Sequence, residues 1–196
     1  MNGNDKGTAV LGAARLPLVG LLLIQLFLGY EWLMSGLTKI VRGGFASGLA
    51  DELAEKSEGV GGWYRSFLDE VVIPNAEVFG WLIVGGELLV AVGLAAAGLL
   101  WLLRWERLGV SGRTAVLAVT ALAALGGVFM NVNFHLANAS AHPWLVPGDG
   151  FDEGVDLDSL MPALQLVLIG VSVGLLRAVR RERSAARPAT GELATD

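Results

Sequence analysis

The chain has 196 residues, enough for one domain, yet 54% of them are hydrophobic and only 17% are charged. Few water-soluble folds of this size have such a balance, so the composition favours an integral membrane protein surrounded by the lipid bilayer. The absence of cysteine excludes disulfides, thiolate nucleophiles, iron–sulfur clusters and thiolate zinc sites. With a net charge of −5, we expect no nucleic-acid partner.

Four stretches are long and apolar enough to cross the bilayer, which takes roughly 20 residues of helix. The first is too long for a secretory signal and lacks a small-x-small cleavage site, so we interpret it as a retained helix. The predicted fold is all-α, a four-transmembrane-helix bundle over residues 16–180, after a cytoplasmic N-terminus (1–15) and before a disordered cytoplasmic tail (181–196). The four stretches cover about residues 16–41, 76–103, 114–135 and 159–179.

Lys and Arg gather on one side of these stretches. The first outer loop, 43–75, has two basic against six acidic residues, and the second, 136–157, has four acidic residues and no Lys or Arg. Because cytoplasmic segments are enriched in Lys and Arg, we predict a multi-pass plasma-membrane protein whose N- and C-termini are both cytoplasmic. The basic residues of the cytoplasmic side are Lys6, Arg15, Arg104, Arg107, Arg113, Arg177, Arg180, Arg181, Arg183 and Arg187.

The first outer loop contains two apolar repeats at helical spacing. They predict short interfacial helices on the membrane surface, with their aromatic side toward the lipid. Pro74 is expected to stop the second of these helices, and Asn75 to cap the spanning helix that follows. The repeats are Phe45, Leu49 and Leu53, then Trp63, Phe67 and Val71.

Glycines recur within the spans, as pairs at 85–86 and 126–127 and as Gly170-x-x-x-Gly174. Small residues let helix backbones approach closely in lipid. Packing within the bundle is the favoured interpretation, and a homo-oligomer seam is the alternative.

Carboxyl groups lie inside two of the spans. At about 1.5 Å per residue, Glu31 lies roughly 15 Å and Glu87 roughly 14 Å below the outer face, so the two acids share a depth. An ionisable group in a span costs about 2.5–3.5 kcal/mol on insertion scales and usually faces a cavity or a partner. Each carboxyl is therefore a candidate proton donor or acceptor.

Other polar residues lie in the same outer half. Glu31, Ser35 and Lys39 are spaced by four and line one face of the first span. These residues predict a polar pocket that opens outward, and Trp32 and Trp81 are candidates for lining it. The alternative is structural: Glu31, Glu87 and Lys39 neutralise one another, the tryptophans pack, and amide side chains join the helices through hydrogen bonds. The further polar residues of this half are Asn131, Asn133 and His135 in the third span and Gln165 in the fourth.

Two histidines, His135 and His142, lie near acidic residues, but their spacing fits no compact set of metal ligands. Both lie at the same end of one helix, so they cannot clamp a haem across the bundle. No flavin motif is present either, and we expect no metal, haem or flavin.

Several short motifs resemble those of the DoxX/DoxD family of four-helix membrane proteins. The likeness covers most of the chain, from about 16 to 180, and it implies a relation to the large subunit of thiosulfate:quinone oxidoreductase, which passes electrons from thiosulfate to membrane quinone. The motifs are GYEWLMSGLTKI at 29–40, Trp63-Tyr64, Phe67, Pro74-Asn75-Ala76, Glu87, and Asn131-Val132-Asn133-Phe134.

The resemblance also implies roles by position, with quinone as the substrate. It assigns proton transfer to Glu31 and Glu87. It assigns binding of the thiosulfate anion to Lys39 and Arg42. Asn131, Asn133 and His135 would donate hydrogen bonds to the quinone carbonyls. The candidate catalytic residues are therefore Glu31, Glu87 and His135, and the candidate binding residues are Trp32, Ser35, Lys39, Arg42, Trp81, Asn131, Asn133 and Gln165.

A rival interpretation is a non-catalytic membrane scaffold or anchor subunit. Two acidic outer loops would repel thiosulfate, a dianion, but they supply a surface for docking a second redox subunit. A permease is a third interpretation, although four helices without an internal repeat make a poor alternating-access machine.

Overall fold

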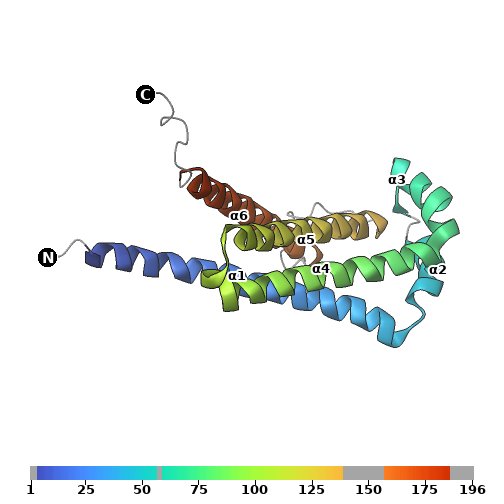
Figure 1. Cartoon of the computed structure of the whole chain (residues 1–196). Helices are drawn as coiled ribbons and strands as arrows, with labels where there is room; N and C mark the ends of the chain where they lie inside the picture. The colour runs from blue at the N-terminus through green and yellow to red at the C-terminus, as the bar shows by residue number, and fades with distance from the viewer. Residues whose placement is uncertain (1–3, 57–58, 139–156, 186–196) are drawn as a thin grey trace, which may run out of the picture.

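The structure, a computed structural model, describes residues 4–56, 59–138 and 157–185. Within these ranges it contains helices and no strand (Figure 1). Four of the described helices are long and apolar enough to cross a membrane, so the predicted all-α four-helix bundle is confirmed and the chain is a multi-pass membrane protein. These helices are α1 (Asn4–Arg42), α4 (Ala76–Arg104), α5 (Val110–Ala137) and α6 (Leu157–Ala185).

The helices are longer than the apolar stretches that predict them. α1 begins at Asn4, so most of the segment predicted as a separate N-terminus is helical and continuous with the first span. α6 continues to Ala185, into the segment predicted as a disordered tail, and the rest of that tail lies outside the described residues. Apolar composition marks where a span lies, whereas Ala, Leu, Arg and Glu also favour helix on either side of it.

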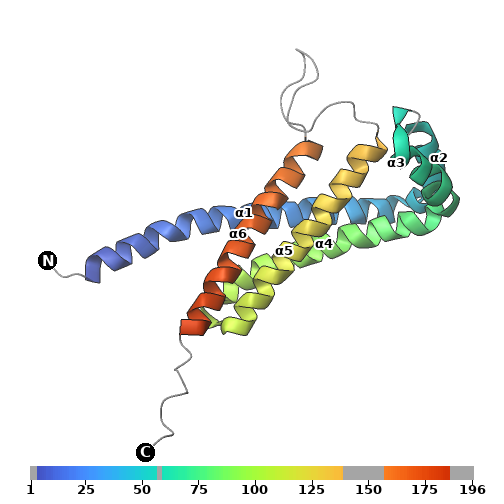
Figure 2. The same cartoon turned by 90° about the horizontal axis from the view of Figure 1, so that it is seen from above.

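The helices of the bundle do not pack equally. α1 lies along α4, and α5 lies along both α4 and α6, whereas α1 and α6 contact each other little and cross (Figure 2). Close approach fixes the register of α1 on α4. A Cβ atom at Gly29 would lie 3.2 Å from the backbone nitrogen of Ala95, and one at Gly36 would lie 2.9 Å from Leu88 Cδ2.

Two short helices, α2 (Phe45–Lys56) and α3 (Gly62–Phe67), cover the end of the bundle at which α1 ends. Gly43 and Gly44 have φ angles of 67° and 77°, which suit glycine and turn the chain from α1 into α2. α2 docks where a Cβ atom at Gly80 would lie 2.5 Å from the Ala46 Cα atom.

The apolar side of α2 faces protein rather than lipid. Leu49 and Leu53 are buried in a core cluster with Tyr64, Leu68 and Val72. Trp63 and Val71, two members of the second predicted repeat, are exposed instead. The two predicted short helices are therefore present, but they bury their apolar faces mainly against each other and α4.

Pro74 does not end the helical path as predicted. After α3 the chain continues through a π-helical turn, η2 (Leu68–Val72), and a 3₁₀ turn, η3 (Ile73–Asn75), directly into α4. Asn75 makes no side-chain cap bond, and its Nδ2 atom donates to the Val71 carbonyl at 2.9 Å. The cap is unnecessary because the preceding turns remain helical.

The glycine pairs differ in what they contact. Cβ atoms at Gly86 and Gly127 would touch Met130 and Gln165, as expected for packing within the bundle. Cβ atoms at Gly170 and Gly174 would meet no atom within 4 Å, so this pair does not pack against another helix of the described bundle.

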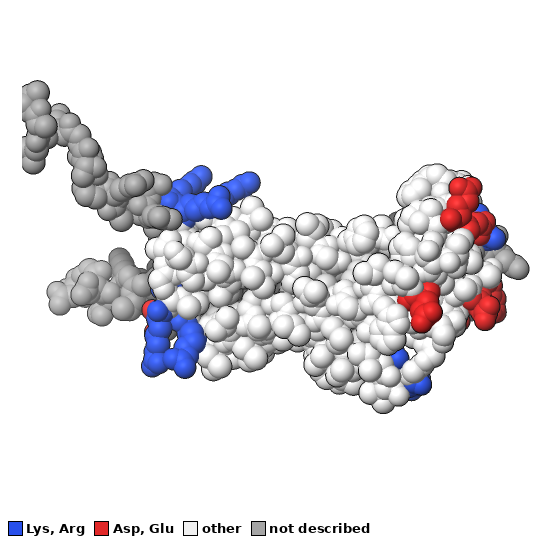
Figure 3. All heavy atoms as spheres, turned by 45° about the vertical axis from the view of Figure 1, so that its right-hand side comes forward, with Lys and Arg blue, Asp and Glu red and all other residues white. Residues whose placement is uncertain are grey.

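Charge divides the surface of the described residues into two ends (Figure 3). We call the end with α2 and α3 the acidic end. The opposite end, where α1 begins and α6 ends, is the basic end. Exposed acidic residues of the acidic end are Asp51, Glu52, Glu55, Asp69, Glu70 and Glu77, and exposed arginines of the basic end are Arg104, Arg107, Arg177, Arg180 and Arg181.

Candidate functional site

A buried carboxylate joins α1 to α4 in the half of the bundle nearest the acidic end. Glu87 Oε1 accepts hydrogen bonds from Lys39 Nζ at 2.7 Å and from Ser35 Oγ at 2.9 Å. Lys39 Nζ also donates to Ser35 Oγ at 2.8 Å. The close approach of the two helices at Gly36, one residue from Ser35, brings the three side chains together.

The two charged partners differ in their access to solvent. The Glu87 side chain is 1% exposed, whereas that of Lys39 is 21% exposed. Lys39 Nζ lies 5.1 Å from the centroid of the Phe45 ring on α2, a cation–π distance. Lys39 therefore extends from the buried carboxylate toward the acidic end.

Three buried side-chain polar atoms have no hydrogen-bond partner in the described structure. They come from three helices: Trp32 Nε1 on α1, Glu87 Oε2 on α4 and Gln165 Nε2 on α6. Two of them are donors and one is an acceptor. Because an unpaired buried polar group costs free energy, such a group needs a reason, such as a ligand or an ordered water.

The packing places Glu87 and Gln165 at similar depths, with Trp32 about one turn away. Gly86, beside Glu87, lies against Met130, and Gln165 lies between Gly127 and Asn131 of α5. Glu87 and Gln165 are therefore level in the bundle. Trp32 precedes Gly36 by one helical turn and lies about one turn closer to the basic end.

Asn131 and Gly127 hold the Gln165 amide in place. Asn131 Nδ2 donates to Gln165 Oε1 at 3.2 Å, which leaves Nε2 as the free donor. A Cβ atom at residue 127 would lie 2.8 Å from Gln165 Cδ, so only glycine gives this amide its room. We call Trp32, Ser35, Lys39, Glu87, Asn131 and Gln165 the interior site.

Glu31 does not meet Glu87 as predicted. Gly29 lies against Ala91, whereas Gly36 lies against Glu87. Glu31 is therefore displaced by a little more than one turn toward the basic end. It is half-buried at the edge of the bundle, and no hydrogen bond or ion pair joins it to another described residue.

The other candidate residues also lie apart from the interior site. Trp81 is 58% exposed on the outer surface of α4. Arg42 is exposed at the end of α1, and His135 is half-buried near the end of α5. Asn133 accepts a hydrogen bond from the Tyr64 hydroxyl on its Oδ1 atom at 3.1 Å, so it anchors α3 to α5.

A second polar cluster, closer to the basic end, was not predicted. Gln25 Nε2 donates to the Leu94 carbonyl at 2.9 Å and to Thr120 Oγ1 at 3.2 Å, and Thr120 Oγ1 donates to the Val116 carbonyl at 3.0 Å. We call this group the Gln25 cluster. A glutamine inside the first span was the available signal, because such a residue usually bonds to a neighbouring helix.

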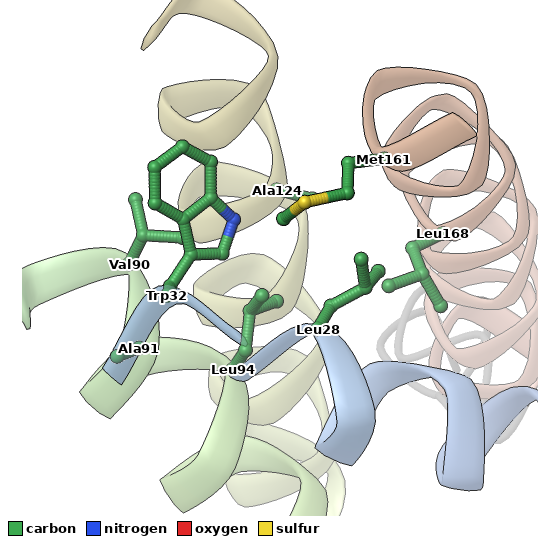
Figure 4. Packing of buried hydrophobic residues seen from close by; sticks show 8 residues of the cluster. All are labelled: Leu28, Trp32, Val90, Ala91, Leu94, Ala124, Met161 and Leu168. Carbon is green, nitrogen blue, oxygen red and sulfur yellow. The ribbon is translucent and has the colours of Figure 1, made fainter. Parts of the chain in front are cut away.

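Buried apolar residues that pack in one cluster (Figure 4) lie along the helices between the two polar clusters. This apolar layer is formed mainly by Leu28, Ala91, Leu94, Ala124 and Leu168, each at most 3% exposed. Beyond it, a hollow between α1 and α6 that reaches Gln25 and Ser172 has room for about 10 Å³. This is close to the smallest volume that holds one water molecule, so the hollow is no chamber for a quinone.

Among the residues described, no three His, Asp or Glu side chains gather into a metal-ligand group, and His142 lies outside those residues. No family model, curated protein or solved structure matches the chain.

Proposed function

We propose that this chain is a DoxX/DoxD-type protein of the plasma membrane, with cytoplasmic termini, that binds the head group of a quinone at its interior site. The main observation in support of this proposal is that three buried atoms have no hydrogen-bond partner: Trp32 Nε1, Gln165 Nε2 and Glu87 Oε2. Two donors complement the two carbonyl oxygens of a quinone, and the carboxylate complements the hydroxyl of a quinol. The GYEWLMSGLTKI motif, which contributes Trp32, Ser35 and Lys39, supports the same proposal.

Glu87 is the proposed proton donor and acceptor. Reduction of a quinone takes up two electrons and two protons, and Glu87 has one carboxylate oxygen free of protein partners. Lys39 and Ser35 hold the other oxygen, so the carboxylate keeps its position while the proton moves. The electrons come from a small reductant such as thiosulfate, or from a second redox subunit.

Charge favours a neutral ligand over thiosulfate at the interior site itself. The Lys39 charge is already balanced by Glu87 at 2.7 Å, so no cation of the site remains to balance a dianion. Of the two cations predicted to bind the anion, Arg42 is the exposed one. Any anionic reductant would therefore have to bind near Arg42, outside the interior site and against the repulsion of the exposed acids of the acidic end.

Calorimetric titration of the detergent-solubilised protein with decylubiquinone tests the proposal. We expect saturable binding that weakens about tenfold in Gln165→Leu and in Trp32→Phe, the effect of losing one donated hydrogen bond of about 1.4 kcal/mol. The matched control is Gln25→Leu, which removes an equally buried glutamine whose Nε2 atom bonds to two protein acceptors, and should leave affinity unchanged. Absent binding, or equal losses in all three variants, would reject the proposal.

The exposed acids favour one alternative, a scaffold subunit that docks a redox partner. Among the described residues, six acidic side chains lie exposed at the acidic end, and Asp51, Glu52 and Glu55 occupy a single helix, α2. Under this alternative, neutralising these three residues releases a partner that co-purifies from the native membrane, while Gln165→Leu has no effect on it. The second outer loop also belongs to the predicted docking surface, but its acidic residues, among them Asp149, Asp152 and Glu153, lie outside the described residues.

A further inference from the structure

Lys39 is the polar connection between Glu87 and the surface of the acidic end. Its Nζ atom donates hydrogen bonds to both Glu87 Oε1 and Ser35 Oγ, while its side chain is 21% exposed. It lies three residues before Arg42, the last residue of α1. A lysine near a helix end can extend along the helix to water without unfolding it.

The path toward the basic end is closed by apolar side chains. Leu28, Leu94 and Ala124 are fully buried in the layer below the interior site. The next polar groups beyond the layer are Gln25 and Thr120. Gln25 donates hydrogen bonds to Leu94 and Thr120, and Thr120 donates one to Val116. The hollow on that side has room for only about 10 Å³. Among the side chains that the structure describes, no continuous polar route leads from the basic end to Glu87.

The other groups packed around Glu87 do not offer a second charged route. Asn131 of α5 and Gln165 of α6 are neutral amides. Glu31 on α1 lies more than a turn away and at the edge of the bundle, and His135 lies one turn beyond Asn131 toward the acidic end. The charged contact that can be followed outward from Glu87, that with Lys39, thus leads to the acidic end.

We propose that the interior site exchanges protons and water with one side of the membrane only, the side of the acidic end, and that Lys39 gates this exchange by leaving and rejoining Glu87. The proposal concerns access, so it goes beyond the proposed quinone function and holds for any ligand of the site. Any proton that Glu87 takes up would then come from that side alone, and any proton that it releases would return there.

The absence of cysteine makes a direct test available, because any single introduced thiol is the only one in the chain. Ser35→Cys places a thiol at the gate, and Thr120→Cys places one in the Gln25 cluster as the matched control. Ser47→Cys on α2 and Ser111→Cys on α5, both exposed serines, mark the acidic and basic ends. The four variants are reconstituted in vesicles and treated, from outside or inside, with a membrane-impermeant cationic methanethiosulfonate.

We expect the thiol at 35 to react from the side that labels the thiol at 47, about tenfold faster than from the side that labels the thiol at 111. The thiol at 120 should react from neither side. Adding Lys39→Gln to Ser35→Cys should raise the rate about threefold or more from the acidic side and leave the basic side unchanged, because the ammonium no longer closes the path.

Three outcomes would overturn the inference: faster reaction at 35 from the basic side, equal reaction from both sides, or no reaction even with Lys39→Gln. Quinone is absent from this assay, so failure of the gate and failure of quinone binding are observed separately. Should Ser35→Cys fold poorly, the rates of Thr38→Cys with and without Lys39→Gln give the same comparison one position before Lys39.

Discussion

The interior site and the Gln25 cluster place similar groups at similar burial, and they differ in whether their hydrogen bonds are complete. In the Gln25 cluster, the Gln25 amide and the Thr120 hydroxyl donate to protein acceptors on α4 and α5. In the interior site, Trp32, Glu87 and Gln165 each keep one atom without a protein partner. Complete bonding stabilises a bundle, whereas incomplete bonding in the interior costs stability and suits binding. The comparison therefore separates a structural cluster from a candidate site within one bundle.

The largest expected effect comes from breaking the ion pair of the interior site. Lys39→Met leaves the Glu87 carboxylate buried without its counter-ion, so we expect the free energy of unfolding to fall by about 3 kcal/mol. Lys39→Met combined with Glu87→Leu removes both charges and should restore most of that loss. Reversible unfolding in mixed SDS–detergent micelles, followed by circular dichroism, measures both variants.

If the double variant is no more stable than Lys39→Met, the pair is not coupled in the way its 2.7 Å distance indicates. The interior site would then tolerate an unpaired charge as readily as a water-exposed surface does. Its ion pair would no longer distinguish it from the Gln25 cluster.

Composition and charge were enough to predict the spans and the division into acidic and basic sides, because the bilayer demands length and apolarity of each helix. The faces of the helices were harder to predict. α4 is apolar on every side, so its sequence gives no period that separates the buried Glu87 face from the lipid-facing Trp81 face. A water-soluble helix would have shown its buried side through polar residues on the other.

The meeting of Glu31 and Glu87 could not be predicted by counting residues from the loops. Depth depends on the register of α1 on α4, which is set by close approach at Gly29 and Gly36. The ion pair of Lys39 with Glu87, by contrast, was part of the structural alternative, because opposite charges inside a membrane seek each other. Tertiary packing thus decided which of two predicted partners Glu87 contacts.

Gly127→Ala is expected to have an intermediate effect, because it disturbs the interior site without removing a polar group. The added methyl group would lie 2.8 Å from Gln165 Cδ, and overpacking of this kind costs about 2 kcal/mol. Gly170→Ala on α6 is the control, since its methyl group meets no atom within 4 Å and should cause no loss. Both are measured by the same unfolding assay. Equal stability of the two variants would mean that the Gln165 amide is not fixed where the structure places it.

The smallest expected effect compares the two buried glutamines directly, through replacement by the similarly shaped methionine. Gln25→Met removes bonds to Leu94 and Thr120, so we expect it to lower the free energy of unfolding by about 1 kcal/mol. Gln165→Met removes one bond to Asn131 but also one unpaired donor, and these changes should nearly cancel. With excess decylubiquinone, the wild type and Gln25→Met should both gain stability through ligand binding, whereas Gln165→Met should gain less. The two clusters would not differ if both variants lost equal stability without ligand and gained equal stability with it. An amide with a free donor would then behave as one whose donors are all paired.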